Sequence, residues 1–526
     1  MVVPVAKRFP VVTFAALFAA ILTVGASRAA ADWRADLEEL ARVEAGPRQE
    51  ELFSKVLASK PEWREVAAAI EALAYADVEA GAFEFRQTVC TDGVERPWVL
   101  FVPPSYDPRA PTPLVVVLHG GVSSPEITDD PLGYAREDEW AAAAAEYGWL
   151  VLYPFGQEGA TWWDDVGMAN IRNLVRTVKR EYNVDDDRVY MGGFSDGGSA
   201  AFCWAMLEPT DFAGFVALNG HMGVGSLDGD LDTYAPNFRN APVYTVTTFD
   251  DALYPSAKMR ATIAMPQRAG GDVFYRELAG THSFDYADAE IPLIARWLAR
   301  HPRDPHPAEV VWEAATAEFG RCRWFKIDEV TRDEAADWHD DYNVALVDER
   351  ITVGFIPADG EGPGVTIAKV IDDSAAAEMG LEEGDVIVGI GDNVVADMDD
   401  VNAWKETVAR GDAFTLRVTR SGDDVTLTGR IPPPENYFIF KRARPSARAN
   451  VTFGGNRVDV LASRLGAFTI YVHPDMFNVD ENVVITVDGV TAFDAKVKPD
   501  VAFMLKNFLA HRDRKTLYVA AVEVEL

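Results

Sequence analysis

The sequence predicts an α/β protein whose central sheet is mostly parallel, doubly wound and covered by helices on both faces. Between residues 114 and 300, short apolar runs of strand length alternate with longer segments of helical periodicity. Leu114–Leu118 contains only leucine and valine, which is typical of a strand buried on both faces. In Arg188–Ala200, a strand pattern changes to a helix pattern across a glycine-rich turn that contains Ser195.

The first 31 residues have the features of a secretory signal peptide. Lys7 and Arg8 provide a basic start, and Val11–Val24 is an apolar run that is short for a membrane span. Small residues at Ala29–Ala31 offer a cleavage site, and an uncleaved anchor is the less favoured alternative. We therefore expect a periplasmic or secreted mature protein with no stable membrane anchor.

Composition narrows the class of protein. With 526 residues and 48% hydrophobic residues, the chain should be globular and contain about three or four domains. The formal net charge of −34 would repel a nucleic-acid backbone, so no nucleic-acid partner is expected. Cys90, Cys203 and Cys322 are too few for a disulfide framework, although a Cys90–Cys322 bond is left open. No Cys/His spacing indicates zinc, and we expect neither a metal nor an organic cofactor.

The expected elements follow the chain in a regular rhythm. Residues 32–82 should form a helical cap or spacer, because apolar residues recur there at helical spacing. The expected strands are Phe83–Cys90, Trp98–Val102, Leu114–Leu118, Trp149–Tyr153, Arg188–Gly192, Phe212–Leu218, Pro242–Thr248 and Val273–Leu278. The expected helices among them are Glu137–Tyr147, Met168–Tyr182, Ser199–Leu207 and Ile291–Arg300. Asp185–Asp187 could suggest a metal site, but a polar turn before the serine strand is the preferred interpretation.

A nucleophilic serine would explain the residue types in Gly193-Phe-Ser-Asp-Gly197. Ser195 would lie at the tip of a strained turn, and Gly193 and Gly197 would allow the strand and the helix to pack closely. The helix that starts after Ser195 would direct free N–H groups, including that of Asp196, at a developing oxyanion. A purely structural turn is the alternative, but the flanking strand and helix patterns favour the nucleophile.

A second oxyanion donor is expected in His119-Gly120-Gly121, directly after Leu114–Leu118. In an α/β-hydrolase sheet, the loop after this strand donates an N–H group to the oxyanion. Glycine allows the backbone to approach a substrate closely. We therefore assign Gly120 and Gly121, with Asp196, to an oxyanion hole.

An acid and a base follow Ser195 in the chain order of the same fold. Asp250 and Asp251 both follow the strand that ends at Thr248, and Asp251 is preferred because it begins an Asp-x-x-aromatic-Pro arrangement. His282 lies in the loop after the last expected strand, and it alone among the eight histidines combines this order with this loop context. Trp162 and Trp163 precede a helix at the same sheet edge, where they could line a substrate pocket or pack as a lid or core.

Five segments resemble secreted esterases related to polyhydroxybutyrate depolymerases and to feruloyl or acetylxylan esterases. They are Trp98-Val-Leu-Phe-Val-Pro-Pro, Val115-Val-Val-Leu-His-Gly-Gly, Asp187-Arg-Val-Tyr-Met-Gly-Gly-Phe-Ser-Asp-Gly-Gly, and the segments around Asp251 and His282. The resemblance covers about residues 83 to 301. It implies an α/β-hydrolase catalytic domain at residues 83–302, and its motifs are specific for the fold but not for the substrate.

A second resemblance, over residues 350–430, is to a PDZ domain of the bacterial type. It rests on Gly364-Val-Thr-Ile-Ala-Lys-Val-Ile, on Ser374-Ala-Ala-Ala-Glu-Met-Gly-Leu-Glu-Glu-Gly-Asp-Val-Ile, and on Asp392-Asn-Val-Val. The resemblance implies that Val353, Gly354 and Phe355 form the loop that holds a peptide carboxylate. The alternative is a module that only packs on the esterase. The flanking residues 303–349 and 431–526 are β-rich, so we expect the module to be inserted into a small β-sandwich-like domain.

These observations predict an exported serine carboxylic-ester hydrolase with the triad Ser195, Asp251 and His282. Its substrate would be a small-molecule or polymeric ester, and peptide C-termini are possible partners of the PDZ-like module. Two alternatives are kept: a serine peptidase of the same fold, and a non-catalytic PDZ binding scaffold whose hydrolase domain is vestigial.

Overall fold

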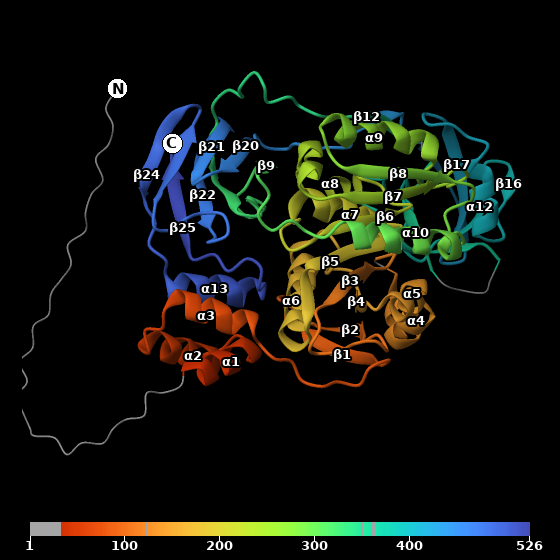
Figure 1. Ribbon diagram of the computed structural model, residues 1–526. Helices are drawn as coiled ribbons and strands as arrows, with labels where there is room; N and C mark the ends of the chain where they lie inside the picture. Colours follow the sequence, from red (N-terminus) through yellow and green to blue (C-terminus); the bar gives the residue numbers. More distant parts are fainter. Residues whose placement is uncertain (1–32, 123, 349–350, 359–362) are drawn as a thin grey trace, which may run out of the picture.

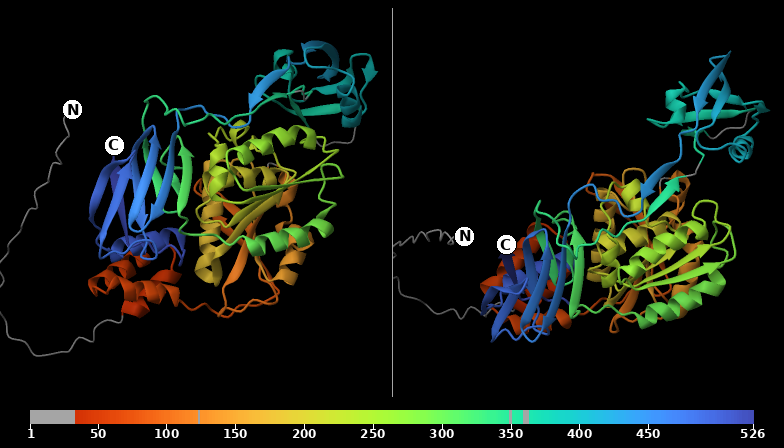
Figure 2. Two further views of the ribbon diagram at one scale, coloured as in Figure 1. Left: turned by 45° about the horizontal axis from the view of Figure 1, so that its top comes forward. Right: turned by 90° about the horizontal axis from the view of Figure 1, so that it is seen from above.

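The computed structural model describes residues 33–122, 124–348, 351–358 and 363–526. The predicted signal peptide lies outside these residues. Figures 1 and 2 show a central α/β unit, a β-rich unit beside it, and a smaller module joined to the rest by two chain segments. Within the described part of the chain, no helix combines the length and the apolar character that crossing a membrane requires.

The α/β unit is built on an eight-stranded sheet of order β1-β2-β4-β3-β5-β6-β7-β8. The β1–β2 and β2–β4 pairs are antiparallel, and every later pair of neighbours is parallel. The strands are β1 (Phe83–Val89), β2 (Glu95–Phe101), β3 (Thr112–Leu118), β4 (Leu150–Pro154), β5 (Val184–Phe194), β6 (Gly214–Leu218), β7 (Val243–Thr248) and β8 (Val273–Leu278). This order confirms the predicted fold class, because it is the arrangement of an α/β-hydrolase sheet.

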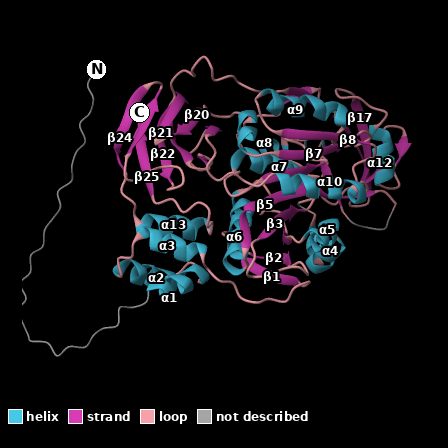
Figure 3. Cartoon of the chain, viewed as in Figure 1, coloured by secondary structure: helices cyan, strands magenta, loops and turns pink. Residues whose placement is uncertain are grey.

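Helices cover both faces of this sheet, as Figure 3 shows. Alternate residues of β3 point to opposite faces: Leu114 and Val116 belong to the core under α6 and α7, whereas Val115 belongs to the core under α5 and α10. The helices are α4 (Pro131–Glu137), α5 (Glu139–Tyr147), α6 (Asp165–Glu181), α7 (Asp196–Leu207), α8 (Val224–Leu227), α9 (Ser256–Arg268) and α10 (Ala287–Arg300), with 3₁₀ turns η1 (Pro125–Thr128) and η2 (Ala235–Asn240). The aliphatic part of β3, Leu114–Leu118, is thus buried on both faces, as its sequence predicts.

The β-rich unit consists of two sheets that share one core. A five-stranded sheet has the order β24-β23-β21-β20-β9, and a four-stranded sheet has the order β10-β11-β22-β25. The strands are β9 (Glu309–Ala314), β10 (Arg321–Cys322), β11 (Phe325–Val330), β20 (Ala447–Gly454), β21 (Arg457–Ser463), β22 (Leu465–Val472), β23 (Asn482–Val487), β24 (Val490–Lys496) and β25 (Ala520–Glu525), and the unit also holds α13 (Val501–His511). Trp312 from one sheet and Phe468 from the other lie in the same core, which agrees with the predicted sandwich.

The N-terminal helices α1 (Trp33–Arg42), α2 (Pro47–Ala58) and α3 (Trp63–Glu71) join this second core. Leu40, Val56 and Ile70 are fully buried in it, and the helices lie against α13 in Figure 1. Residues 33–71 are therefore more than the predicted cap or spacer, because their apolar faces complete the core of the β-rich unit.

The inserted module has its own sheet and its own core. Its sheet has the order β13-β14-β15-β17-β18, with β16 paired to β15, and its core includes Ile387, Val401 and Leu416. Its elements are β13 (Phe355–Pro357), β14 (Val365–Val370), α11 (Ala375–Glu378), β15 (Val386–Ile390), β16 (Asn393–Val394), α12 (Met398–Lys405), β17 (Ala413–Arg420) and β18 (Asp423–Arg430). β12 (Ala345–Asp348) precedes the module in the chain and β19 (Glu435–Phe438) follows it. These two strands pair with each other and form a two-stranded antiparallel ribbon.

The three cysteines are free and buried. Cys203 lies on α7 in the core, as a small apolar residue would, and Cys90 and Cys322 belong to different units. The possible Cys90–Cys322 bond is therefore not formed in this structure.

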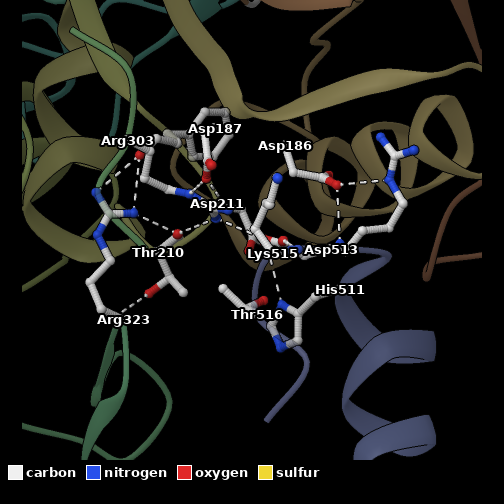
Figure 4. Close-up of polar contacts among 12 residues, drawn as sticks. Asp186, Asp187, Thr210, Asp211, Arg303, Arg323, His511, Asp513, Lys515 and Thr516 are labelled. Atoms are coloured by element: carbon white, nitrogen blue, oxygen red, sulfur yellow. Dashed lines mark hydrogen bonds and ion pairs between the residues drawn. The ribbon is translucent and has the colours of Figure 1, made fainter. Parts of the chain in front are cut away.

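The three aspartates 185–187 are not the predicted turn but the first part of β5. Asp186 and Asp187 take part in an ionic cluster that joins the α/β unit to the C-terminal segment (Figure 4). Asp187 accepts hydrogen bonds from Arg303 at 2.9 and 3.1 Å, and Asp186 pairs with Lys179 at 3.1 Å and with Arg514 at 3.1 Å. The pattern of the local sequence could not show this role, because two of these cations lie more than one hundred residues away.

Arg303 lies at the centre of this cluster, with a side chain that is 0% exposed. Its guanidinium donates to Asp513 at 2.6 Å and to the carbonyl of Thr210 at 3.2 Å, in addition to Asp187. Replacing Arg303 with methionine should lower the free energy of unfolding by about 3–5 kcal/mol, because the buried carboxylate of Asp513 and the partly buried carboxylate of Asp187 would lose their cation. Chemical denaturation would measure the change. The control is Arg260→Met, which removes an exposed pair with Glu277 and should leave the unfolding midpoint unchanged. Equal stability of the two variants would contradict the proposed role of the cluster.

Candidate active site

Ser195 lies between the end of β5 and the start of α7, in a backbone conformation with φ 56° and ψ −116°. Such a positive φ is strained for a residue with a side chain, and it holds the hydroxyl at the tip of the turn. A Cβ on Gly193 or on Gly197 would overlap the carbonyl oxygen of Leu118. The sequence argument for these two glycines therefore agrees with the packing of the turn against β3.

Three side chains from separate loops meet at the carboxyl edge of the sheet. The Nε2 atom of His282 lies 2.8 Å from Ser195 Oγ, and its Nδ1 atom lies 2.8 Å from Asp251 Oδ2. His282 follows β8 and Asp251 follows β7, so parallel strands bring both residues to the edge where β5 ends. The structure thus brings together the predicted nucleophile, base and acid in hydrogen-bond contact, and their catalytic roles remain predictions.

Asp251 is only 2% exposed, whereas the competing Asp250 is exposed. Its Oδ1 atom accepts from the backbone N–H groups of Leu253 and Tyr254, each at 2.8 Å. Burial favours the neutral acid, but the hydrogen bonds from His282, from Asn219 and from the Tyr254 N–H outweigh it and hold the pKa of Asp251 below its ordinary value. The carboxylate therefore stays charged and can orient the imidazole.

Asn219 is a site residue that the sequence analysis missed. Its Nδ2 atom donates to Asp251 Oδ2 at 2.8 Å and to Thr248 Oγ1 at 2.6 Å, and its Oδ1 atom accepts from the hydroxyl of Tyr286 at 2.6 Å. The available signal was its position directly after β6, because polar residues at that point of a parallel strand lie at the ligand-binding edge.

The predicted oxyanion loop lies directly against the nucleophile. A Cβ on Gly120 would come within 3.0 Å of Ser195 Cβ, so only glycine leaves this approach open. The carboxylate of Asp196 accepts the backbone N–H of Val122 at 3.0 Å, which ties the loop to the first residue of α7. Because the N–H group of Val122 is engaged, Gly120, Gly121 and the backbone N–H of Asp196 remain the candidates for oxyanion donors.

His119 supports this loop from beneath. Its ring is 2% exposed, with Nδ1 at 2.8 Å from the carbonyl oxygen of Gly120 and Nε2 accepting from the N–H of Gly156 at 3.0 Å. A neutral imidazole with its proton on Nδ1 satisfies both contacts. Burial lowers the pKa of His119 to about 4, so the ring remains neutral at physiological pH.

This burial predicts a pH effect on stability. Between pH 6.5 and 4 the unfolded chain binds a proton on His119 that the folded protein does not, so acidification through this range should destabilise the fold. The contribution is about 1.4 kcal/mol per pH unit. Urea unfolding at pH 7 and at pH 5 gives the free energy of unfolding of the wild type and of His119→Asn at each pH. The wild type should lose more of this free energy between the two pH values than the variant does. The same dependence of the free energy of unfolding on pH in the two proteins would contradict a neutral His119 in the folded state.

Trp162 and Trp163 are 1% and 6% exposed and belong to the core. The indole N–H of Trp162 donates to the carbonyl oxygen of His119 at 3.0 Å. Their burial favours the core interpretation over the pocket one, and Trp162 acts as a support beneath the oxyanion loop.

A cavity of 320 Å³ lies beside Gly120. Its apolar lining includes Phe194, Phe284 and Trp140, and its polar lining includes Glu137, Asp138 and Glu139. Phe194 and Phe284 stack with ring centroids 5.9 Å apart, and Phe194 also lies 5.0 Å from the ring of His282. This cavity, rather than the tryptophan pair, offers space for a substrate group beside Gly120 and Phe194.

The predicted carboxylate loop of the inserted module combines a buried valine with a glycine in the left-handed region. Val353 is 2% exposed and Gly354 has φ +95°, and Phe355 begins β13. The carbonyl oxygen of Gly354 accepts from the N–H of Ile371 at 3.0 Å and from the hydroxyl of Ser374 at 3.1 Å. Since β13 is the edge strand of its sheet, it has the position needed for the addition of a peptide strand.

One group of potential metal ligands, far apart in the sequence, comes together outside this site. Ligand atoms of His306, His473 and Asp475 lie within 4.8 Å of one another. The two rings are tilted by 31° to each other with centroids 4.1 Å apart, and the N–H of Asp475 donates to Nδ1 of His473 at 3.2 Å. Burial, reinforced by the positive charge of Arg303, lowers the pKa of His306 to about 4. Contact between two neutral imidazoles accounts for this group, and the nearby guanidinium of Arg303 disfavours a cation, so we assign no metal to it.

Comparison with known proteins identifies the inserted module. Residues 349–430 match the family model described as "PDZ domain". This part of the chain is therefore a PDZ domain, in agreement with the resemblance of its sequence.

Part of the chain is similar to an esterase. The bifunctional acetylxylan esterase/xylanase of Neocallimastix patriciarum is 32% identical over 109 residues, which cover 20% of this chain and 15% of that protein. A solved thermostable esterase shares 25% identity with a TM-score of 0.35, over 42% of this chain and 63% of that one. The fluorophosphonate-binding serine hydrolase F of Staphylococcus aureus shares 18% identity with a TM-score of 0.35, over 42% and 99% of the two chains. The match to the curated relative spans a small part of its length, and the fold assignment rests on the strand order described above.

Proposed function

We propose that this protein is a serine carboxylic-ester hydrolase. The observation that carries the proposal is the hydrogen-bonded row Ser195–His282–Asp251, with Ser195 held on a strained turn at the start of α7. A nucleophile, a base within hydrogen-bond reach and a group that orients the base are the parts that nucleophilic catalysis requires. The similarity to an acetylxylan esterase supports the same reaction class.

In the proposed reaction, Ser195 Oγ attacks the carbonyl carbon of the ester while His282 Nε2 takes the hydroxyl proton. Asp251 stabilises the imidazolium. The negative oxygen of the tetrahedral intermediate accepts hydrogen bonds from the backbone N–H of Asp196 and from that of Gly120 or Gly121. The intermediate collapses to an acyl-enzyme when His282 protonates the departing alcohol. Water then attacks the acyl group with His282 as base, which releases the carboxylic acid and restores the serine.

The cavity beside Gly120 gives the first constraint on the substrate. Its aromatic walls, Phe194 and Phe284, would pack on an apolar acyl or alcohol group, and its 320 Å³ exceeds the space that an acetyl group alone requires. Acetylated and aromatic esters of polysaccharides are the substrates to test first, because the curated relative acts, by its name, on acetylxylan.

Reaction with a fluorophosphonate tests the proposal directly. The probe should form one covalent adduct per chain, and peptide mapping should place it on Ser195. A panel of p-nitrophenyl esters and of acetylated and feruloylated polysaccharides would then rank substrates. No labelling would favour the alternative of a non-catalytic binding scaffold, and hydrolysis of peptides without ester preference would favour a serine peptidase.

The PDZ domain supports a second, binding function. We propose that the open edge of β13 and the loop Val353-Gly354-Phe355 receive an extended peptide and its C-terminal carboxylate. We also propose that residues 1–31 are removed as a signal peptide and that the mature protein works outside the cytoplasm. N-terminal sequencing of that protein should then begin just after Ala29 or Ala31.

A deletion can separate the two functions without breaking the ribbon. Asp348 and Glu435 are directly paired at the end of the ribbon, so an Asn-Gly turn between them should close a hairpin in place of residues 349–434. The shortened protein should keep its kcat/KM for a p-nitrophenyl ester, because the PDZ domain has a separate core. Loss of that activity in a shortened protein with a normal unfolding transition would contradict this separation.

A further inference from the structure

The ribbon that carries the PDZ domain is seated on the α/β unit. In the β12–β19 pair, Leu346 lies opposite Tyr437, and both side chains pack on the core of the α/β unit. Phe438, the next residue along, is 54% exposed on the other face of the ribbon. The chain then enters the α/β unit, where Ile439 is fully buried and its carbonyl oxygen accepts from the hydroxyl of Ser226 at 3.3 Å.

Tyr437 is the first of four rings that lead to the catalytic centre. Its ring centroid lies 6.0 Å from that of His221, and His221 lies 5.3 Å from Tyr254. Tyr254 in turn lies edge-on to His282, with centroids 5.7 Å apart. The row Tyr437–His221–Tyr254–His282 thus joins the PDZ ribbon to the catalytic base.

Hydrogen bonds fix the middle of this row. Nδ1 of His221 accepts the backbone N–H of Gly223 at 3.0 Å, so in the neutral ring the proton lies on Nε2 and is donated to the Tyr437 hydroxyl at 3.3 Å. The backbone N–H of His221 donates to Ser199 Oγ at 2.9 Å, at the start of the helix behind Ser195. His221 is 6% exposed, so its ring has little room to turn once Tyr437 is in place.

The same row reaches the catalytic acid. Tyr254 belongs to the loop after β7, and its backbone N–H donates to Asp251 Oδ1 at 2.8 Å. A shift of Tyr254 would therefore move both a neighbour of the base and a hydrogen-bond donor to the acid. Catalysis is sensitive to such shifts, because a displacement of about 1 Å can cost about 100-fold in rate.

We propose that Tyr437 is a positioning residue of the ester-hydrolysing site, which it supports through His221 and Tyr254. This inference rests on the proposed function. It assigns the PDZ ribbon a role in the active site, since the strand that leads out of the PDZ domain carries the residue that supports the acid and base. A force or a ligand that displaces the ribbon would then change the turnover of the serine.

The test compares Tyr437→Ala, Tyr437→Phe and Phe438→Ala in the full-length protein. Phe438→Ala is the matched control, because it removes an aromatic ring from the same strand on the face that points away from the catalytic row. Active serines are titrated with a fluorophosphonate, and kcat and KM are measured for a p-nitrophenyl ester. Tyr437→Ala should lower kcat per titrated serine by about tenfold with little change in KM, because the catalytic groups rather than the substrate lose support. Tyr437→Phe should recover most of the loss, since it keeps the ring, and Phe438→Ala should match the wild type.

A purely structural role would reduce the fraction of titratable serine and leave kcat per serine unchanged, which would overturn the inference. An equal loss of kcat in Phe438→Ala would overturn it as well. If the wild type does not react with the fluorophosphonate, the proposed function and this inference both fall. A reactive wild type with an unaffected Tyr437→Ala variant rejects this inference alone.

Discussion

Replacing Ser195 with alanine should lower kcat for a p-nitrophenyl ester by about 10⁶-fold, to the background rate of the assay. The hydroxyl 2.8 Å from His282 Nε2 is the only nucleophile that the row of hydrogen bonds activates, and alanine has no atom to replace it. The variant should also fail to react with a fluorophosphonate. Steady-state kinetics and mass spectrometry of the intact protein would measure the two effects.

The fold should survive this change. Ser195 is held by its backbone, whose N–H donates to the carbonyl oxygen of Leu218 at 2.9 Å, and alanine keeps that contact. The unfolding midpoint of Ser195→Ala should therefore equal that of the wild type. Ester hydrolysis that persists in a folded Ser195→Ala protein would exclude the triad as the site of reaction.

Replacing Asp251 with asparagine should lower kcat by about 10⁴-fold. Asparagine can donate an N–H group to Nδ1 of His282, and the imidazole proton would then lie on Nε2. A protonated Nε2 atom could no longer accept the proton of Ser195. The amide N–H would also face the donor Nδ2 of Asn219. In addition, the residue would lose the negative charge that Asn219 and the N–H groups of Leu253 and Tyr254 stabilise. The kcat of the purified variant, normalised to folded protein, measures the effect.

Asp250→Asn is the control for this prediction. Asp250 differs from Asp251 by one position and is exposed, so the same change of charge there should leave kcat unaffected. If Asp250→Asn were the inactive variant, the assignment of the acid would be reversed. If both variants were active, the imidazole would not depend on a carboxylate from this loop.

Much of the α/β unit could be predicted because its signals are local. The glycines around Ser195 and the aliphatic run of β3 follow from sterics and burial over a few residues. The order of the triad then follows from the parallel sheet, since successive strands deliver their following loops to one edge. The insertion of the PDZ domain could also be predicted from the sequence, because its motifs interrupt a β-rich stretch that continues after them.

Other features depend on contacts between residues far apart in the sequence, for which no local pattern exists. The segment expected to be a polar turn contributes Asp187 to an ionic cluster, because Asp187 pairs with the distant Arg303. The segment expected to be a spacer is part of the β-rich unit, because α1–α3 share its core. Trp162 became a support for the oxyanion loop, since its indole meets His119 across 43 residues.

The amino-acid sequence thus specified the strand–turn–helix around Ser195 and the chain order of Ser195, Asp251 and His282, since short-range sterics and hydrophobic periodicity encode both. The folded chain settled which aspartate meets His282, that Asn219 supports it, and that Tyr437 of the PDZ ribbon reaches toward the catalytic row. These outcomes depend on burial and on the relative placement of elements. Both properties arise only when segments far apart in the sequence pack against one another.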